Sequence, residues 1–207
     1  MRKDKITVIG AGGHSKVVVD AIVAQDKFQI EAIIDDDITK ANFKFLDYDI
    51  VHSSQIDRVQ ARNFVVALGC DATRKEKFDL YQKLGFSPVT IIHPNAIVSQ
   101  FADIGVGNMI FAGAIINPHA HLKDNIIINT AAVIEHDVVI SNHGQISPGA
   151  VVCGACCLSE FVNIGAGAVV KPNIRIGKNV VVGAGATVVK HIEFEGIYVG
   201  TPAKKLS

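Results

Sequence analysis

An aliphatic residue recurs every six positions through the second half of the chain, and this repeat constrains the fold more than any other feature. From Ile92 to Val188 in steps of six, every position holds Ile, Leu or Val. A fixed short period indicates that one small structural unit is repeated along the chain. The positions are Ile92, Val98, Ile104, Ile110, Ile116, Leu122, Ile128, Ile134, Ile140, Ile146, Val152, Leu158, Ile164, Val170, Ile176, Val182 and Val188.

The other positions of the repeat predict its geometry. The fourth residue after each aliphatic is mostly small, as at Ala114, Ala132 and Cys156, which suits a narrow interior. The third is mostly Asn or Gly, the residues that tolerate a positive φ at a corner. Each hexad is therefore interpreted as a short strand and a turn, three hexads close an 18-residue coil, and coils stack about 4.8 Å apart. The Asn and Gly corner residues are Asn95, Gly107, Gly113, Asn125, Gly149, Gly167, Asn173, Asn179 and Gly185.

The first ninety residues have a different pattern. Residues 5–9 are typical of a strand, 14–24 of a helix and 31–34 of a second strand, which together make a βαβ unit. A further strand over 64–68 and a helix over 73–84 extend it into a small parallel sheet. We therefore predict an α/β Rossmann-like domain over 1–91. A parallel β-helix over 92–190 and a C-terminal tail over 191–207 follow.

Composition excludes several classes of function. The 207 residues carry 20 basic and 20 acidic side chains, so no net charge draws the chain to nucleic acid or to an anionic membrane. The N-terminus has neither a signal peptide nor a membrane span, so we expect a cytoplasmic protein without membrane insertion. In that compartment the four cysteines are expected to be reduced, buried small hydrophobes that bind no metal, and they are Cys70, Cys153, Cys156 and Cys157.

A glycine-rich loop follows the first predicted strand. Residues 10–15 read Gly-Ala-Gly-Gly-His-Ser, and Ser15 stands where a dinucleotide-binding loop has its third glycine, so NAD is not expected. The loop is either a plain strand-to-helix turn or a site where backbone N–H groups meet a phosphate or a sugar hydroxyl. Asp35 and Asp36, after the second strand, lie where such folds hold hydroxyls or an amine.

One corner of the predicted β-helix carries an imidazole between two carboxylates, Glu135, His136 and Asp137. A neutral imidazole is the usual base for taking a proton from an attacking nucleophile, and a carboxylate on its far nitrogen orients it. Eighteen residues after His136 is Gly154, which leaves a gap beside the ring. The N–H of Gly154 or its neighbour Ala155 is a candidate oxyanion donor.

The carboxylate of Asp137 has a second possible partner. The 18-residue spacing stacks Asp137 over His119, so the alternative is that these two side chains pair and only steady the corner. Glu135 is interpreted as a surface residue.

Several motifs together resemble a known family. They are the glycine loop, the pair Asp35 and Asp36, residues 67–69 with Arg74 downstream, the hexad repeat, and the tail 199–205. In this order they resemble the bacterial sugar O- and N-acyltransferases related to sialic acid O-acetyltransferase. Within that family the chain is most similar to the acetyltransferases that modify a UDP-4-amino-sugar on the way to bacillosamine. The resemblance implies a left-handed β-helix and a homotrimer, with acetyl-CoA lying between adjacent prisms.

The resemblance also implies roles for residues. His136 is expected to be the base and Asp137 its partner. The family's second histidine, which contacts acetyl-CoA, falls on Gln145, while a histidine occurs at His143. The implied contacts with the UDP-amino-sugar are Gly12, Gly13, His14, Asp35, Asp36 and Gly69, and those with acetyl-CoA are Gln145, Gly154, Ala155, Gly167, Lys204 and Lys205.

Three alternatives remain open at this point. In the first, the acetyl group is transferred to a hydroxyl of sialic acid or of another sugar. The second is a zinc hydratase of the γ-carbonic anhydrase kind, but the positions two coils from His136 hold Gln100 and Pro172 and so lack the ligands. The third is a β-helix that binds without catalysing.

Overall fold

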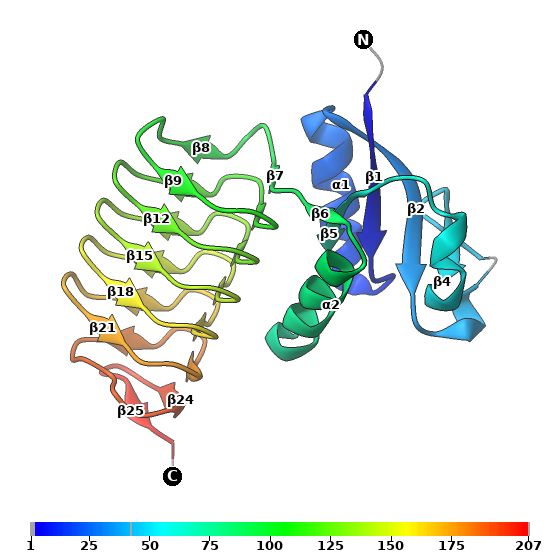
Figure 1. Ribbon diagram of the computed structural model, residues 1–207. Coiled ribbons are helices and arrows are strands. Elements are labelled where there is room, and N and C mark those ends of the chain that lie inside the picture. Colours follow the sequence, from blue (N-terminus) through cyan, green and yellow to red (C-terminus); the bar gives the residue numbers. More distant parts are fainter. Residues whose placement is uncertain (1–2, 42, 207) are drawn as a thin grey trace. The chain divides into compact units, whose positions relative to one another are not determined.

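The structure, a computed structural model, describes residues 3–41 and 43–206. They form two compact units, one that ends at Pro94 and one that begins at Asn95 (Figure 1). This boundary lies three residues later than the predicted one. The segment predicted as a tail contributes strands to the second unit.

The first unit is a parallel sheet with a helix on each face. Its strand order is β3-β4-β2-β1-β5-β6, and only β3 and β4 pair antiparallel. The elements are β1 (Asp4–Ile9), α1 (Gly13–Gln25), β2 (Phe28–Asp35), β3 (Lys44–Phe45), β4 (Tyr48–His52), β5 (Asn63–Val66), α2 (Asp71–Lys83) and β6 (Ser87–Pro88), with 3₁₀ turns over Ile38–Lys40 and Ser53–Arg58.

The two helical connections of this sheet run toward opposite edges. The connection through α1 leads to β2 on one side, and β5 pairs with the other side of β1 and continues through α2 to β6. Right-handed connections that run in opposite directions place their helices on opposite faces. The loops after β1 and β5 therefore meet at the switch point of the sheet, where α/β folds bind ligands.

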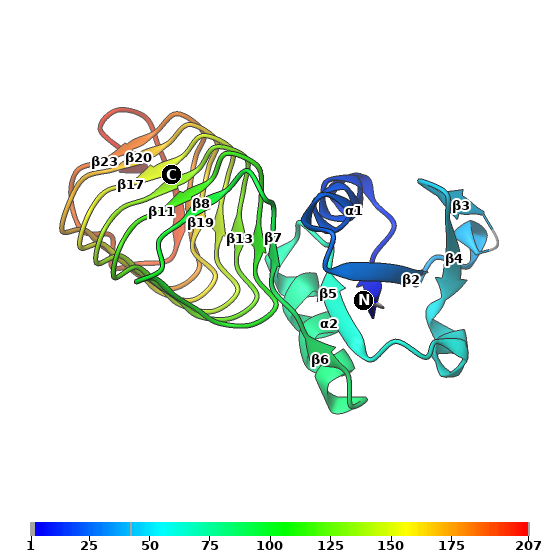
Figure 2. The same ribbon diagram turned by 90° about the horizontal axis from the view of Figure 1, so that it is seen from above.

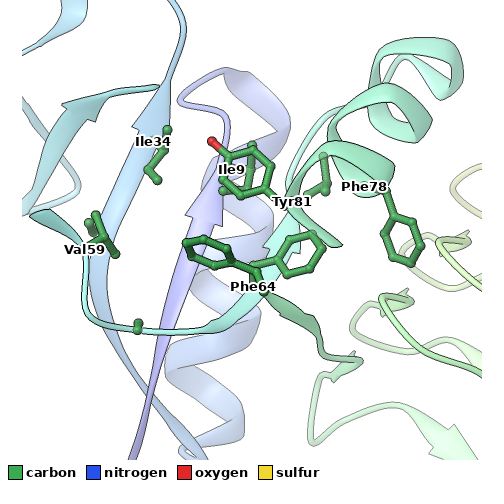
Figure 3. Close-up of a cluster of buried hydrophobic side chains, with 10 residues drawn as sticks. Ile9, Ile34, Val59, Phe64, Phe78 and Tyr81 are labelled. Atoms are coloured by element: carbon green, nitrogen blue, oxygen red, sulfur yellow. The ribbon is translucent and has the colours of Figure 1, made fainter. Parts of the chain in front are cut away.

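An aromatic cluster packs α2 onto the sheet (Figure 3). The Phe64 ring of β5 lies 5.7 Å from the Tyr81 ring and 5.9 Å from the Phe78 ring, measured between centroids. Both ring partners lie on α2, so this helix and the loop that precedes it are held firmly against β5.

The second unit is the predicted left-handed parallel β-helix. From β8 to β23 the paired strands are eighteen residues apart, as Ile127 and Gln145 are, and β22 pairs with β24 at a spacing of sixteen. The strands form the three sides of a prism, seen along its axis in Figure 2. Face 1 holds β10 (Met109–Ile110), β13 (Ile127–Ile128), β16 (Gln145–Ile146), β19 (Asn163–Ile164), β22 (Val180–Val182), β24 (Gly196–Val199) and β25 (Lys204–Lys205).

The other two sides complete the prism. Face 2 holds β8 (Ile97–Val98), β11 (Ile115–Ile116), β14 (Val133–Ile134), β17 (Val151–Val152), β20 (Val169–Val170) and β23 (Thr187–Val188). Face 3 holds β9 (Asp103–Ile104), β12 (His121–Leu122), β15 (Val139–Ile140), β18 (Cys157–Leu158) and β21 (Arg175–Ile176). The short strand β7 (Ile91–Ile92) precedes them and belongs to the first unit.

The aliphatic repeat lines the interior as predicted. From Ile110 to Val188 every residue of the repeat is buried, and the small residues four positions later, such as Ala132 and Cys156, are buried with them. A cross-section filled by branched aliphatics opposite small residues has no room for Trp, which the chain lacks.

The corners adopt a positive φ at more positions than composition predicted. The Asn and Gly residues predicted at the corners all have a positive φ, except Asn95. Residues with larger side chains also take this conformation, including His119, Asp137 and Phe161. Left-handed backbone costs such residues about 1 kcal/mol or more, so the bonds between coils impose it.

The cysteines only partly fit the prediction. Cys156 is buried, and its thiol lies 3.2 Å from the carbonyl oxygen of Lys171. Cys70 and Cys157 are exposed, which corrects the expectation of burial, because they lie at a helix N-terminus and on an outward strand position. All four thiols are free.

Two neighbours on β20 test the role of the repeat. Val170 is fully buried and Val169 is 37% exposed. We expect Val170→Ala to lower the free energy of unfolding by about 2 kcal/mol through lost burial and a cavity, and Val169→Ala by about 0.5 kcal/mol or less. Urea unfolding followed by circular dichroism measures both. Equal losses would contradict the inward assignment.

Candidate functional site

His136 and Asp137 occupy the corner between β14 and β15, which is hereafter corner A. His136 Nδ1 lies 2.8 Å from the Asp137 carboxylate, and both side chains are more than half exposed. The alternative pairing of Asp137 with His119 is wrong in the described structure: the carboxylate contacts His136, and the His119 ring stacks on Phe101.

Gly154, one coil further, shapes the position of the imidazole. A Cβ on Gly154 would lie 2.6 Å from both Cε1 and Nε2 of His136, so the ring rests against the glycine backbone. The predicted gap beside the ring is therefore filled by the ring itself. Only glycine permits this placement, because any side chain would push the imidazole away.

The two candidate oxyanion donors differ. The N–H of Ala155 donates to the carbonyl of His136 at 2.9 Å, so the prediction for this N–H is wrong because coil stacking already uses it. Within the described part of the chain, the N–H of Gly154 donates to no backbone acceptor. Gly154 is the remaining candidate of the two.

The structure places the other predicted acetyl-CoA contacts away from corner A. Gln145, Lys204 and Lys205 lie on face 1, which does not adjoin corner A. Gly167 lies at the corner between faces 1 and 2 and has open space where a Cβ would be. Within one chain these residues and His136 do not meet.

His143 belongs to the interior of another corner. Its side chain is buried, its Nδ1 lies 2.9 Å from the Asn125 amide nitrogen, and its ring stacks on Phe161 with centroids 5.1 Å apart. This geometry steadies the corner between faces 3 and 1.

Two lysines that sequence reasoning missed lie at the C-terminal end of corner A. Pro172 and then Lys190 follow Gly154 at successive 18-residue steps, and Lys171 and His191 lie beside them along an open groove. Lys190 is three coils, or about 14 Å, from His136. The 18-residue arithmetic applied to the whole corner would have found these residues.

In the first unit, the loops after β1 and β5 line an open pocket of about 130 Å³ with Asp35, Asp36 and Lys77. The predicted contacts Gly12, Gly13 and Gly69 all have open space where a Cβ would lie. Gly10 is different, because it has a φ of 108° and a Cβ there would meet Leu68 at 2.7 Å.

Asp35 organises the glycine loop. One of its carboxylate oxygens accepts the N–H of Ala11 at 2.7 Å and the other accepts the N–H of Asp37 at 2.9 Å, while Lys40 lies 3.2 Å from both. These contacts occupy the carboxylate that was expected to hold a ligand hydroxyl or amine. Asp35 thus holds the loop in shape, and it also lines the pocket.

Asp36 also lines the pocket. It pairs with Lys77 of α2, and this hydrogen bond holds the pKa of Asp36 below its usual range. The pair presents an acceptor and a cation side by side, which suits the polar groups of a nucleotide.

Ser15 explains the missing third glycine. Its hydroxyl accepts the N–H of Gly12 at 3.2 Å and donates to the carbonyl of Ala67 at 3.0 Å, so it ties the glycine loop to the end of β5. A glycine at this position could do neither.

Arg74 is buried beneath the loop after β5. Its guanidinium donates to the carbonyls of Leu68 and Gly69 at 3.3 and 3.2 Å, and burial lowers its pKa to about 10. Burial and the charge of Arg74 lower the pKa of His14 to about 4. His14 is therefore neutral near pH 7.

No group of His, Cys, Asp or Glu side chains in residues 3–41 and 43–206 has the arrangement of a metal site.

No helix in the described part of the chain has the length and apolar character needed to span a bilayer.

Comparisons with known proteins agree with both units. Residues 5–81 match the PglD N-terminal domain, and residues 158–190 match the bacterial transferase hexapeptide family. UDP-N-acetylbacillosamine N-acetyltransferase of Bacillus subtilis is 36% identical over 113 residues, which is 52% of this chain. The match spans about half the length of that curated relative, 51%.

Solved structures match nearly the whole chain. A variant of perosamine N-acetyltransferase from Caulobacter crescentus, in complex with CoA and GDP-perosamine, is 31% identical with a TM-score of 0.93 and covers 98% of this chain and 97% of its own. The acetyltransferase domain of PglB from Neisseria gonorrhoeae, in complex with acetyl coenzyme A, is 33% identical with a TM-score of 0.91, and the match covers 99% and 100%.

The neutral His14 predicts a pH effect on stability. Its pKa is lower in the folded chain than the unfolded value of about 6.5, so only the unfolded chain takes up this proton as the pH falls from 6.5 toward 4. Stability should therefore drop over this range. We expect the drop in unfolding free energy between pH 7 and pH 5 to be smaller in His14→Gln by on the order of 1 kcal/mol. Urea unfolding at the two pH values measures it, and equal drops would contradict the assignment.

Proposed function

Because the chain belongs to the bacterial sugar N-acetyltransferases built on hexapeptide repeats, we propose that it transfers an acetyl group from acetyl-CoA to the 4-amino group of a UDP-4-amino-4,6-dideoxy-sugar. His136 is the general base, and Asp137 is its partner. Both co-substrates are cytoplasmic metabolites, so the reaction is placed in the cytoplasm.

The contact between His136 and Asp137 carries this proposal. A carboxylate 2.8 Å from Nδ1 favours the tautomer in which Nδ1 holds the proton, so Nε2 has a free lone pair. Resting the ring against Gly154 fixes where that lone pair lies. An oriented, solvent-accessible imidazole is the group that acyl transfer to an amine requires.

The reaction then proceeds in two proton transfers at Nε2. The amine nitrogen attacks the thioester carbonyl carbon while Nε2 takes a proton from the nitrogen, and Asp137 stabilises the imidazolium. The N–H of Gly154 supports the oxyanion that forms. When the tetrahedral intermediate collapses, the carbon–sulfur bond breaks and the imidazolium returns the proton to the CoA sulfur.

The glycine-loop pocket of the first unit binds the nucleotide portion. Gly12, Gly13 and Gly69 leave room for phosphate and ribose, and His14 at the start of α1 adds no charge there near pH 7. Asp36 and Lys77 supply the polar contacts at the pocket wall.

Acetyl-CoA lies along corner A, with its thioester at His136 and its phosphates toward Lys171 and Lys190. Lysine is a common phosphate ligand, and the three coils between His136 and Lys190 leave the length of a pantetheine arm. Gln145, Gly167 and the tail lysines, on other sides of the prism, reach the same cofactor only from a neighbouring copy. We infer that the active assembly is the homotrimer that the family resemblance implies, with acetyl-CoA between prisms.

The proposed activity is tested by thiol release from acetyl-CoA. We expect release with a UDP-4-amino-4,6-dideoxy-sugar and none with sialic acid, and we expect His136→Ala to lower kcat by about 10²-fold or more, the usual contribution of a general base. Gly154→Ala should have a similar effect, because the new Cβ displaces the imidazole.

The control for these variants is Glu135→Gln, a carboxylate beside His136 that is not its hydrogen-bond partner. Its kcat should stay within about twofold of the wild type. Activity on the hydroxyl acceptor alone would overturn the N-acetyltransferase, and an unchanged rate in His136→Ala would overturn the base.

The cationic end of corner A makes a separate prediction. Lys190→Ala should raise the KM for acetyl-CoA about fivefold to tenfold with little change in kcat, because it removes one charge-assisted phosphate contact. Lys123→Ala, another exposed lysine of the prism, is the control. A normal KM in Lys190→Ala, together with a raised KM in Lys204→Ala, would instead assign the phosphates to the tail.

A further inference from the structure

Two exposed rings continue corner A on the N-terminal side of His136. His119 lies one coil before Asp137, and Phe101 lies one coil before His119. Backbone bonds join the three coils at this corner, from the Asp137 N–H to the Pro118 carbonyl at 3.3 Å and from the His119 N–H to the Phe101 carbonyl at 3.1 Å. The two rings stack with centroids 6.3 Å apart and planes inclined by 27°.

The core of the prism does not require these rings. Phe101 is 61% exposed, His119 is exposed, and the interior beneath them is filled by the aliphatic repeat. Ser99 nevertheless holds the Phe101 turn, since its hydroxyl accepts the Phe101 N–H at 3.2 Å. Phe101 and His119 thereby present two stacked, exposed ring faces at a defined position on the corner.

Corner A therefore differs on the two sides of the base. On the C-terminal side lie Gly154, Pro172 and Lys190, where the acetyl-CoA of the proposed function runs toward its phosphates. On the N-terminal side lie the rings. The attacking amine must reach Nε2 while the thioester occupies the other side, so the ring carrying that amine comes to the N-terminal side.

We propose that Phe101 and His119 form the subsite for the acceptor sugar. This inference rests on the proposed function and specifies its acceptor as a pyranose with an apolar face. The C–H face of the sugar packs on the stacked rings, and the methyl group of a 6-deoxy sugar adds apolar contact where a hydroxymethyl group would have to lose water. Polar groups flank the rings on face 3, where His121 Nδ1 lies 3.6 Å from the Asp103 carboxylate, and they serve the remaining hydroxyls.

The subsite is tested by kinetics with acetyl-CoA saturating and the acceptor varied. Phe101→Ala should raise the KM for the amino sugar about tenfold, with kcat and the KM for acetyl-CoA within about twofold of the wild type. His119→Asn should also raise it, and it keeps the fold because Asn tolerates the φ of 61° at this corner. Phe101→Tyr should restore the KM.

The matched control is Phe194→Ala, because Phe194 is an aromatic side chain of the same unit that is 72% exposed and lies away from corner A. It should leave all constants unchanged. If the wild type acetylates the amino sugar but Phe101→Ala and His119→Asn have a normal acceptor KM, the subsite is overturned while the proposed function stands.

A binding measurement separates the subsite from the reaction. In saturation-transfer NMR with the methyl glycoside of 4-amino-4,6-dideoxyglucose, the C6 methyl signal should receive saturation from the wild-type protein. It should lose most of this saturation with Phe101→Ala and keep it with Phe194→Ala. Equal transfer to all three proteins, or none to the wild type, overturns the subsite whether or not the protein turns over any acceptor.

Discussion

Backbone hydrogen bonds between successive coils hold every residue of the prism at a fixed height, and the functional geometry depends on them. Because each coil has eighteen residues, side chains from distant hexads form columns on each corner. The same bonds impose a left-handed backbone on residues as large as Asp137 and Phe161. The burial of the aliphatic repeat offsets that local strain. A corner position can therefore hold a functional side chain where glycine would otherwise be favoured.

Corner A shows how a regular scaffold becomes a site. The contact from His136 to Asp137 joins adjacent residues, but the position of the ring is set by Gly154 from the next coil. Rings on one side and cations on the other then divide the corner into two regions of different chemistry. The column thus fixes the order of the rings, the imidazole and the lysines along the prism.

The pocket of the first unit is formed by loops rather than by a stacked corner. Two loops meet at the switch point of a parallel sheet, and buried polar contacts shape each of them: Asp35 holds the loop after β1, and Arg74 holds the loop after β5. Ser15 joins the two loops. Space remains beside the loop glycines and at the pair formed by Asp36 and Lys77.

The sequence by itself determined the β-helix and the α/β unit, because each follows from a short period or from the pattern of neighbouring residues. Only the tertiary structure decided that Ala155 donates within the stack, that Asp35 serves its own loop and that His143 lies inside another corner. It also decided that Asp137 faces His136 rather than His119. The reason is physical: spacing predicts which residues are neighbours, whereas the partner that each polar group takes depends on side-chain direction and on competing backbone groups, which no period encodes.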